Sequence, residues 1–172
     1  MKTEKIARMV GKTTYKDFRD GFSGATLHDD SDADIKMALG MAQRQAGVLA
    51  VQVLETRYAS TLMHERVIRR ARDRHLNDSA KRLGVKRDQP TTAKQRLACA
   101  LAIRKLAGAR VIGLEVTEYA WMLCSRREDL DDHMRSAEAW LNDLCTTATD
   151  AFLTALEVIA PRRNRVRSSR AA

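Results

Sequence analysis

Histidine, cysteine and clustered acidic residues are the side chains of this sequence whose types could support catalysis or metal binding. The four histidines, His28, His64, His75 and His133, lie far apart in the sequence, and none belongs to a HExxH pair. The chain also lacks a glycine-rich phosphate loop and a GxSxG nucleophile motif. These observations predict that the protein is not an enzyme and that it binds no cofactor.

Metal binding is not expected either. The three cysteines are odd in number and have no CxxC spacing, which argues against a disulfide framework and against a structural zinc site. Asp129, Asp131 and Asp132 are close in sequence, but helical spacing spreads their carboxylates around the helix. Acidic residues in a first turn complement the positive end of the helix dipole, and this is the preferred interpretation of the cluster.

Charge is distributed unevenly along the 172 residues, whose net charge is +9. Residues 64–87 contain nine Lys/Arg and three acids, and residues 161–172 add five arginines and no acid. Residues 115–144 instead contain eight acids and three arginines. Segregated positive charge favours a nucleic-acid partner at the basic regions. The alternative is an arginine-rich helix face that is simply solvated.

The pattern of apolar residues predicts an all-α protein. Apolar side chains recur at steps of three and four from Ile35 to about Tyr58, interrupted by Gly40 and Gly47, for which close helix packing is the expected compensation. A basic helix is expected over residues 62–83, with Gly84 ending it.

Two further helices are marked by capping boxes, in which Ser or Thr is followed three residues later by Gln or Glu. Thr92 with Gln95 predicts the start of a helix that Gly108 closes, and Ser125 with Glu128 opens a long C-terminal helix. A heptad-like apolar seam follows over residues 130–159, which suits packing within the chain or, alternatively, a homo-oligomer. The expected organisation is a polar segment over 1–30, a helical bundle over 31–160 and a basic flexible tail over 161–172.

Helix-turn-helix spacing occurs twice. In the first candidate, Ala80, Leu83 and Gly84 suit the first helix and the turn, but Pro90 delays the second helix. The second candidate lies within residues 115–144, where Ala120 and Leu123 are correctly spaced. Its second helix begins with acidic residues, which are unusual against a phosphate backbone.

The second candidate and its surroundings carry a family resemblance. "LETRYA" (residues 54–59), a basic helix, and then "TEYAWMLCSRRED", "MRSAEAWLNDL" and "AF" resemble the C-terminal, sigma-region-4-like helix-turn-helix of phage late-gene antitermination proteins of the Q type. The likeness covers roughly residues 48–153. Some members of this family carry a cysteine-built zinc finger, which this chain lacks.

The resemblance implies a DNA-binding transcription regulator that binds a promoter-proximal element, contacts RNA polymerase and travels with it past terminators. DNA, with RNA as a further option, would be bound by Arg66, Arg69, Arg70, Arg72, Arg74, Lys81, Arg82, Lys86, Arg87, Arg126, Arg127, Arg135, Arg162, Arg163 and Arg165. RNA polymerase would be met by Glu128, Asp129, Asp131 and Asp132. The competing interpretation is that these acids only balance the helix dipole and neighbouring arginines, with DNA bound by residues 64–87 and the tail.

Two other functions fit the same composition. One is a phage DNA-packaging adaptor such as a small terminase subunit, and the other is a protein inhibitor whose basic helix docks on an acidic surface. No apolar run approaches the roughly 20 residues that a membrane span needs, and the N-terminus has no apolar signal-peptide core. The sequence therefore predicts a cytoplasmic protein of a bacterial host.

Overall fold

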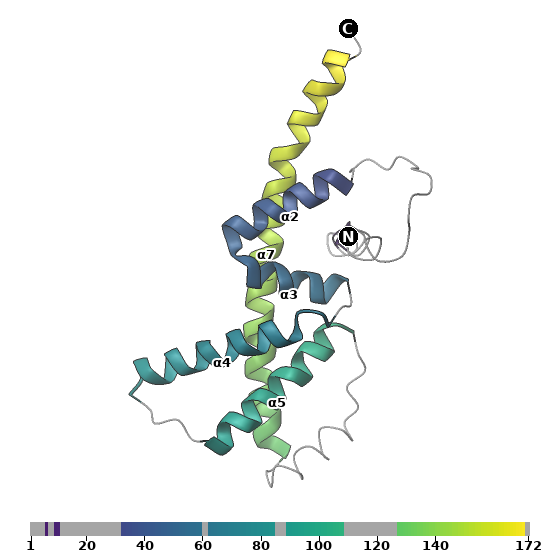
Figure 1. Cartoon of the computed structure of the whole chain (residues 1–172). Coiled ribbons are helices and arrows are strands. Elements are labelled where there is room, and N and C mark those ends of the chain that lie inside the picture. The colour runs from purple at the N-terminus through teal and green to yellow at the C-terminus, as the bar shows by residue number, and fades with distance from the viewer. Residues whose placement is uncertain are drawn as a thin grey trace. The chain divides into compact units, whose positions relative to one another are not determined.

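The computed structural model confirms the all-α prediction (Figure 1). It describes residues 6, 9–10, 32–59, 62–84, 89–108 and 127–170. Within these ranges there are five helices and no strand. They are α2 (Asp32–Ala46), α3 (Val48–Tyr58), α4 (Glu65–Arg82), α5 (Gln89–Leu106) and α7 (Arg127–Arg170). None of the described helices has a stretch that is both long and apolar enough to cross a membrane.

The chain forms two compact units, and the boundary between them falls inside α7. The first unit contains α2, α3 and the part of α7 from Leu144 onward. The second unit contains α4, α5 and the part of α7 up to Asp143. Each unit has apolar side chains of its own to bury.

The core of the first unit is built from the apolar positions that recur at helical spacing. Its buried side chains come from α2 (Ile35, Ala38, Leu39, Ala42), α3 (Ala50, Val51, Val53, Leu54) and α7 (Cys145, Ala148, Ala151, Phe152, Ala155, Ile159). Ile6, Met9 and Val10 are buried as well. Arg57, from the "LETRYA" stretch, donates a hydrogen bond to Sγ of Cys145 at 3.8 Å.

Gly47 separates α2 from α3, so the apolar stripe over residues 35–58 belongs to two helices. Its φ of +90° and ψ of 153° lie in a region that only glycine occupies readily. The prediction that helices pack closely against Gly40 and Gly47 is wrong. A Cβ built on either glycine would meet no atom within 4 Å in the described part of the chain.

In the second unit, α4 and α5 lie next to each other (Figure 1). Gly84 follows α4 and Gly108 follows α5, both with positive φ as expected of residues that end helices. However, α5 begins at Gln89, and the prediction of Thr92 as its N-cap is wrong. Pro90 is tolerated in the first turn because the backbone N–H that proline lacks has no intrahelical partner there.

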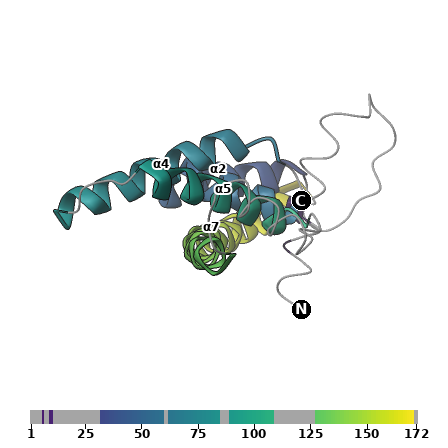
Figure 2. The same cartoon turned by 90° about the horizontal axis from the view of Figure 1, so that it is seen from below.

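The apolar seam of α7 is buried in the single chain. This is the arrangement expected if the seam serves packing within the chain. In the second unit, Leu130 and Met134 of α7 pack with Ala98 and Leu101 of α5. Figure 2 shows α4 and α5 together on one side of this part of α7. A helix-turn-helix is not confirmed. Residues 115–126 of the second candidate and residues 85–88 of the first lie outside the described ranges.

At its C-terminal end, α7 continues through Pro161 to Arg170, whereas the sequence places a flexible tail from residue 161. The backbone stays helical at Pro161, with one helical hydrogen bond fewer. Because Pro161 has no N–H, the carbonyl of Glu157 loses its usual partner four residues on.

Candidate nucleic-acid interface

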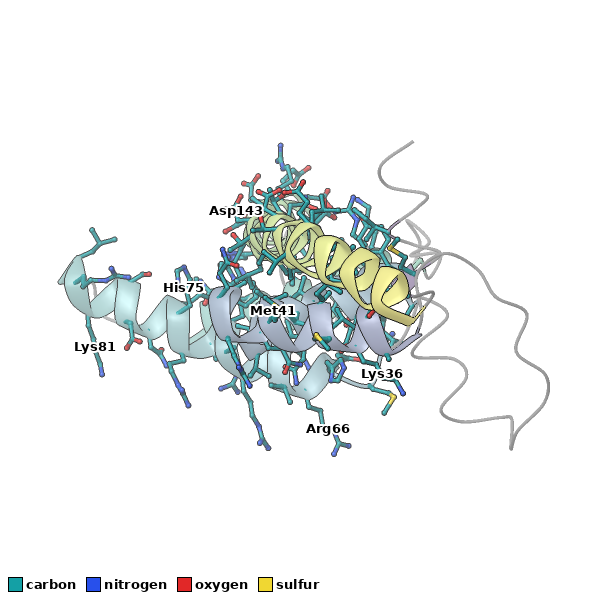
Figure 3. All side chains as sticks on the ribbon, turned by 90° about the horizontal axis from the view of Figure 1, so that it is seen from above. Lys36, Met41, Arg66, His75, Lys81 and Asp143 are labelled. Carbon is teal, nitrogen blue, oxygen red and sulfur yellow. The ribbon has the colours of Figure 1, made fainter. Side chains whose placement is uncertain are left out.

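Four basic residues form one exposed face of α4, which we call the α4 basic face: Arg66, Arg70, Arg74 and Lys81. At about 100° per residue, these positions fall within an arc of about 80° around the helix. Asn77 is the other residue in that arc, and it carries no charge. Figure 3 shows that Arg66 and Lys81 point to the same side, away from α7.

The α4 basic face is long and its charges are directed to solvent. At about 1.5 Å per residue, the helix rises about 22 Å between Arg66 and Lys81. None of the four side chains forms an ion pair with another residue of the described chain. They are therefore available to an anionic partner.

Carboxylates border the α4 basic face on both sides. By helical geometry, Asp73 lies about 20° beyond Arg66, and Asp78 lies about 40° beyond Arg74. Asp73 accepts a hydrogen bond from Nε of Arg96 at 2.9 Å, whereas Asp78 is exposed. The positive surface is thus a single row rather than a broad patch.

Other basic residues of α4 have partners of their own. Arg69 lies 3.4 Å from Glu65 in an ion pair one turn away. Arg82 is bonded to the carbonyl of Asp78 at 3.3 Å and to the hydroxyl of Ser79 at 3.4 Å. Both residues are predicted nucleic-acid contacts. The bonds of Arg82 are exposed and can be exchanged for a phosphate at little cost, whereas Arg69 and Glu65 are half-buried.

Arg72, which is also a predicted nucleic-acid contact, is buried and does not belong to the α4 basic face. It is only 5% exposed. Its Nη2 donates a hydrogen bond to Oγ of Ser136 at 2.8 Å, and its guanidinium lies 5.2 Å from the centroid of the Trp140 ring. Burial lowers the pKa of Arg72, but the guanidinium stays charged because its ordinary pKa is so high. Arg72 therefore joins α4 to α7.

A sequence signal for this role exists. Arg72 falls four residues after Ile68 and four before Leu76, so it lies on the thin apolar side of the helix. Residue type alone suggested exposure, but position on the helix indicates burial. Its partners on α7, Ser136 and Trp140, could not be identified without the tertiary structure.

The acids of α7 are partly matched by the lysines of α5. Lys94 lies 3.5 Å from Asp129, and Lys105 lies 2.8 Å from Glu138. On α7 itself, Arg135 pairs with Asp132. Glu128 and Asp129 also occupy the first turn, where negative charge is favourable. These contacts give the acidic helix start a structural purpose within the second unit.

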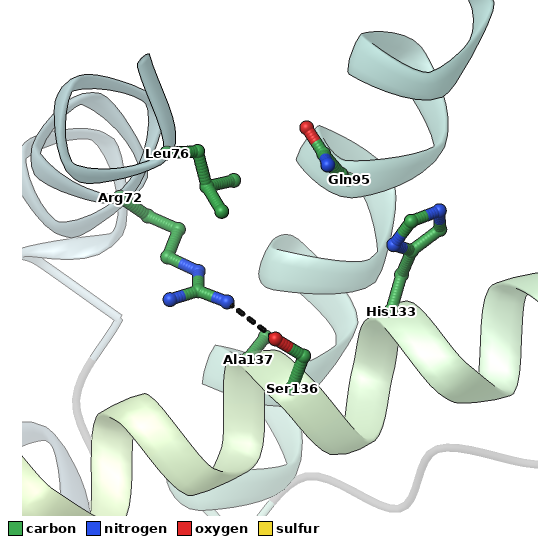
Figure 4. A pocket seen from close by; sticks show the side chains of 6 residues that line it. All are labelled: Arg72, Leu76, Gln95, His133, Ser136 and Ala137. Atoms are coloured by element: carbon green, nitrogen blue, oxygen red, sulfur yellow. Dashed lines mark hydrogen bonds between the residues drawn. The ribbon is translucent and has the colours of Figure 1, made fainter. Parts of the chain in front are cut away.

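One pocket lies between the three helices of this unit, lined by Arg72, Leu76, Gln95, His133, Ser136 and Ala137 (Figure 4). Its volume of about 20 Å³ suits one water molecule and is far too small for an organic ligand. Burial, and then Lys94, lower the pKa of His133. Among the residues whose placement is described, no group of three His, Cys, Asp or Glu could hold a metal ion.

Lys86, Arg87 and Arg126 lie outside the described ranges. The backbone of Arg127, Arg162, Arg163 and Arg165 is helical, as part of α7. Of the predicted set, the structure thus brings together four residues on the α4 basic face.

Comparison with known proteins adds no relative. No family model matches the chain, and neither the curated proteins nor the solved structures contain a match.

Proposed function

We propose that this chain binds nucleic acid without catalysis and that the α4 basic face is its main contact surface. The observation that carries the proposal is the row of four exposed cations with no acid inside its arc and no ion-pair partner within the described chain. A stripe of cations along one helix is typical of a surface that binds nucleic-acid phosphates. Neutralising them releases condensed counterions, which supplies most of the affinity of sequence-independent binding.

The more specific proposal is transcription regulation of the Q antitermination type, with RNA polymerase as the second partner. Its support is the sequence resemblance over residues 48–153. On this hypothesis, the acids at the start of α7 have a second use. Exposed Glu128 and Asp132 would meet a basic polymerase surface while Lys94 holds Asp129.

The general proposal is tested by titrating the full chain with a DNA duplex at several salt concentrations. If the α4 basic face alone supplies four contacts, affinity should fall by about 100-fold between 50 and 200 mM salt. Replacing Arg70 by Gln should weaken binding. Arg104→Gln, which removes an exposed arginine of α5, is the matched control. Binding that ignores salt would refute the proposal and favour the inhibitor with a basic docking helix.

The specific proposal needs a transcription assay. Purified bacterial RNA polymerase, started from a phage late promoter, should read through a downstream terminator when the chain is present. Glu128→Gln with Asp132→Asn should abolish read-through without weakening DNA binding, because the two changes remove negative charge only. DNA binding without any effect on read-through would refute antitermination and leave DNA packaging as the alternative.

A further inference from the structure

We infer that the pocket between α4, α5 and α7 binds a single halide ion such as chloride, which compensates the buried positive charge of Arg72. The site is separate from the proposed function and does not depend on it. Three observations support it: a buried guanidinium without a carboxylate partner, the hydrogen-bond donors around the pocket, and the size of the pocket.

The guanidinium of Arg72 is a buried cation without an anionic partner. Arg72 is 5% exposed, and no carboxylate lies within ion-pair distance of it among the described residues. Burial lowers its pKa, and the group that opposes this shift is the Cys99 thiol rather than a carboxylate. The Ser136 hydroxyl and the Trp140 ring contact the guanidinium, but neither carries a negative charge. An uncompensated buried charge is costly, so an anion taken up from solution would stabilise it.

Acidic residues close by in the fold do not supply this charge. Asp73, the next residue on α4, has its carboxylate 2.9 Å from Nε of Arg96. Asp129, one turn before the pocket residues of α7, lies 3.5 Å from Nζ of Lys94. Packing of the three helices therefore gives these acids cations of their own and leaves Arg72 without a counter-ion in the described chain.

The other polar groups around the pocket can all donate a hydrogen bond. Figure 4 shows Gln95 and His133 across the pocket from Arg72. Neither side chain forms a hydrogen bond or ion pair with another described residue. The imidazole is neutral at pH 7, because burial and Lys94 lower its pKa, and it offers one N–H as the Gln95 amide does. The oxygen of Ser136 accepts from Arg72 at 2.8 Å, so its own O–H is available to donate.

The size of the pocket selects among anions. Its volume of about 20 Å³ is that of a site for one water molecule. A halide ion is of similar size, whereas phosphate, sulfate and carboxylates are larger. The rest of the lining, Leu76 and Ala137, is apolar and carries no competing negative charge. A water molecule would satisfy the donors but would leave the charge of Arg72 uncompensated.

The experiment measures urea unfolding of the full chain at constant ionic strength while chloride replaces glutamate, an anion too large for the pocket. Because only the folded chain brings the three helices together, bound chloride should raise the folding equilibrium constant by the factor 1 + [Cl⁻]/Kd. For a Kd of about 50 mM, 200 mM chloride should raise it about fivefold.

Two matched variants assign this effect to the pocket. Gln95→Leu removes one donor and should reduce the chloride effect to less than about twofold. Gln43→Leu makes the same change at an exposed position of α2 and should retain the full effect. The general influence of exchanging one salt for another is common to both variants, so the difference between them reports the pocket alone.

Crystals grown in sodium bromide provide a direct second measurement, because bromide scatters anomalously and water does not. An anomalous peak beside Arg72 and Ser136 would confirm the site. Ordered density there without an anomalous signal would overturn the inference in favour of a water molecule. Stability of the parent protein that does not depend on chloride would overturn it as well. An equal chloride effect in Gln95→Leu and Gln43→Leu would overturn the assignment to this pocket.

Discussion

At the scale of single residues, Arg72 holds α4 against α7 in the second unit. Its buried guanidinium is bonded to the hydroxyl of Ser136 and lies over the ring of Trp140. A hydrogen bond from a charged group contributes about 1.5–3 kcal/mol, and a desolvated cation–π contact about 2 kcal/mol. The stability of this joint therefore depends strongly on one side chain.

We expect Arg72→Ala to lower the free energy of unfolding by about 2–4 kcal/mol, because it removes both interactions and leaves a void beside Trp140. Urea unfolding followed by far-UV circular dichroism measures the change. Arg70→Gln, two residues earlier and exposed on another side of the helix, should stay within about 0.5 kcal/mol of the parent protein. Equal stabilities of the two variants would show that Arg72 is not a structural residue.

Because the thiol of Cys99 is buried, we expect the free energy of unfolding to fall at alkaline pH. It is 1% exposed, and burial raises the pKa of its thiol from 9.0 to about 11. Between these values the unfolded chain releases the proton while the folded chain retains it. The free energy of unfolding should therefore fall as pH rises from 9 to 11, by up to about 1.4 kcal/mol per pH unit from this group.

The contribution of Cys99 is isolated by comparison with Cys99→Ala. Tyr58, whose pKa is raised by burial, titrates in the same direction but is present in both proteins. The parent protein should lose its advantage over Cys99→Ala progressively between pH 9 and pH 11 in urea unfolding. A constant difference across that range would mean that the thiol is not protected from ionisation.

At the scale of elements, Gly40 and Gly47 form a matched pair. Gly40 lies inside α2 and Gly47 between α2 and α3, and added Cβ atoms would meet nothing within 4 Å in the described chain. Gly40→Ala should raise the free energy of unfolding by about 0.5–1 kcal/mol, because alanine favours the helix. Gly47→Ala should lower it by about 1–3 kcal/mol, because its φ of +90° is strained for any L side chain.

Thermal and urea unfolding of both glycine variants check this opposition of signs. Stabilisation by Gly47→Ala would mean that residues 32–58 prefer one continuous helix, as their apolar spacing alone suggests.

Sequence patterns predicted the helices more reliably than their ends and contacts. The basic helix, its end at Gly84 and the apolar seam of α7 were predictable, since glycine conformation and apolar spacing are local properties. The break at Gly47 was not, because the same spacing continues on both sides of it. The helix α5 starts earlier than the capping box at Thr92 predicts, because Pro90 suits a first helical turn.

The candidate site divides in the same way. Its cationic row could be predicted from spacing along one helix. The burial of Arg72 is indicated by its position on the apolar side of α4. Its partners Ser136 and Trp140 could not be predicted, because they lie on a helix more than 60 positions away in the sequence.

At the scale of the whole molecule, positive charge is concentrated in two separate regions, α4 and residues 161–172. Deleting residues 161–172 removes five arginines and should reduce the salt slope of duplex binding by up to about 4.5. Affinity should weaken alike for unrelated sequences, and the far-UV helical signal should fall only in proportion to the helical residues removed. Loss of cooperative unfolding in the truncated chain would instead indicate that this segment packs against the core.

Trp140 gives the protein a built-in optical reporter. Its indole has the Arg72 guanidinium at 5.2 Å and the His75 ring at 6.0 Å, and both neighbours come from α4. Indole emission responds to nearby cations and to exposure to water, so separation of α4 from α7 should change it even if both helices stay intact. In a Trp121→Phe background, which leaves Trp140 as the single tryptophan, fluorescence would follow that joint alone, while circular dichroism sums over every helix.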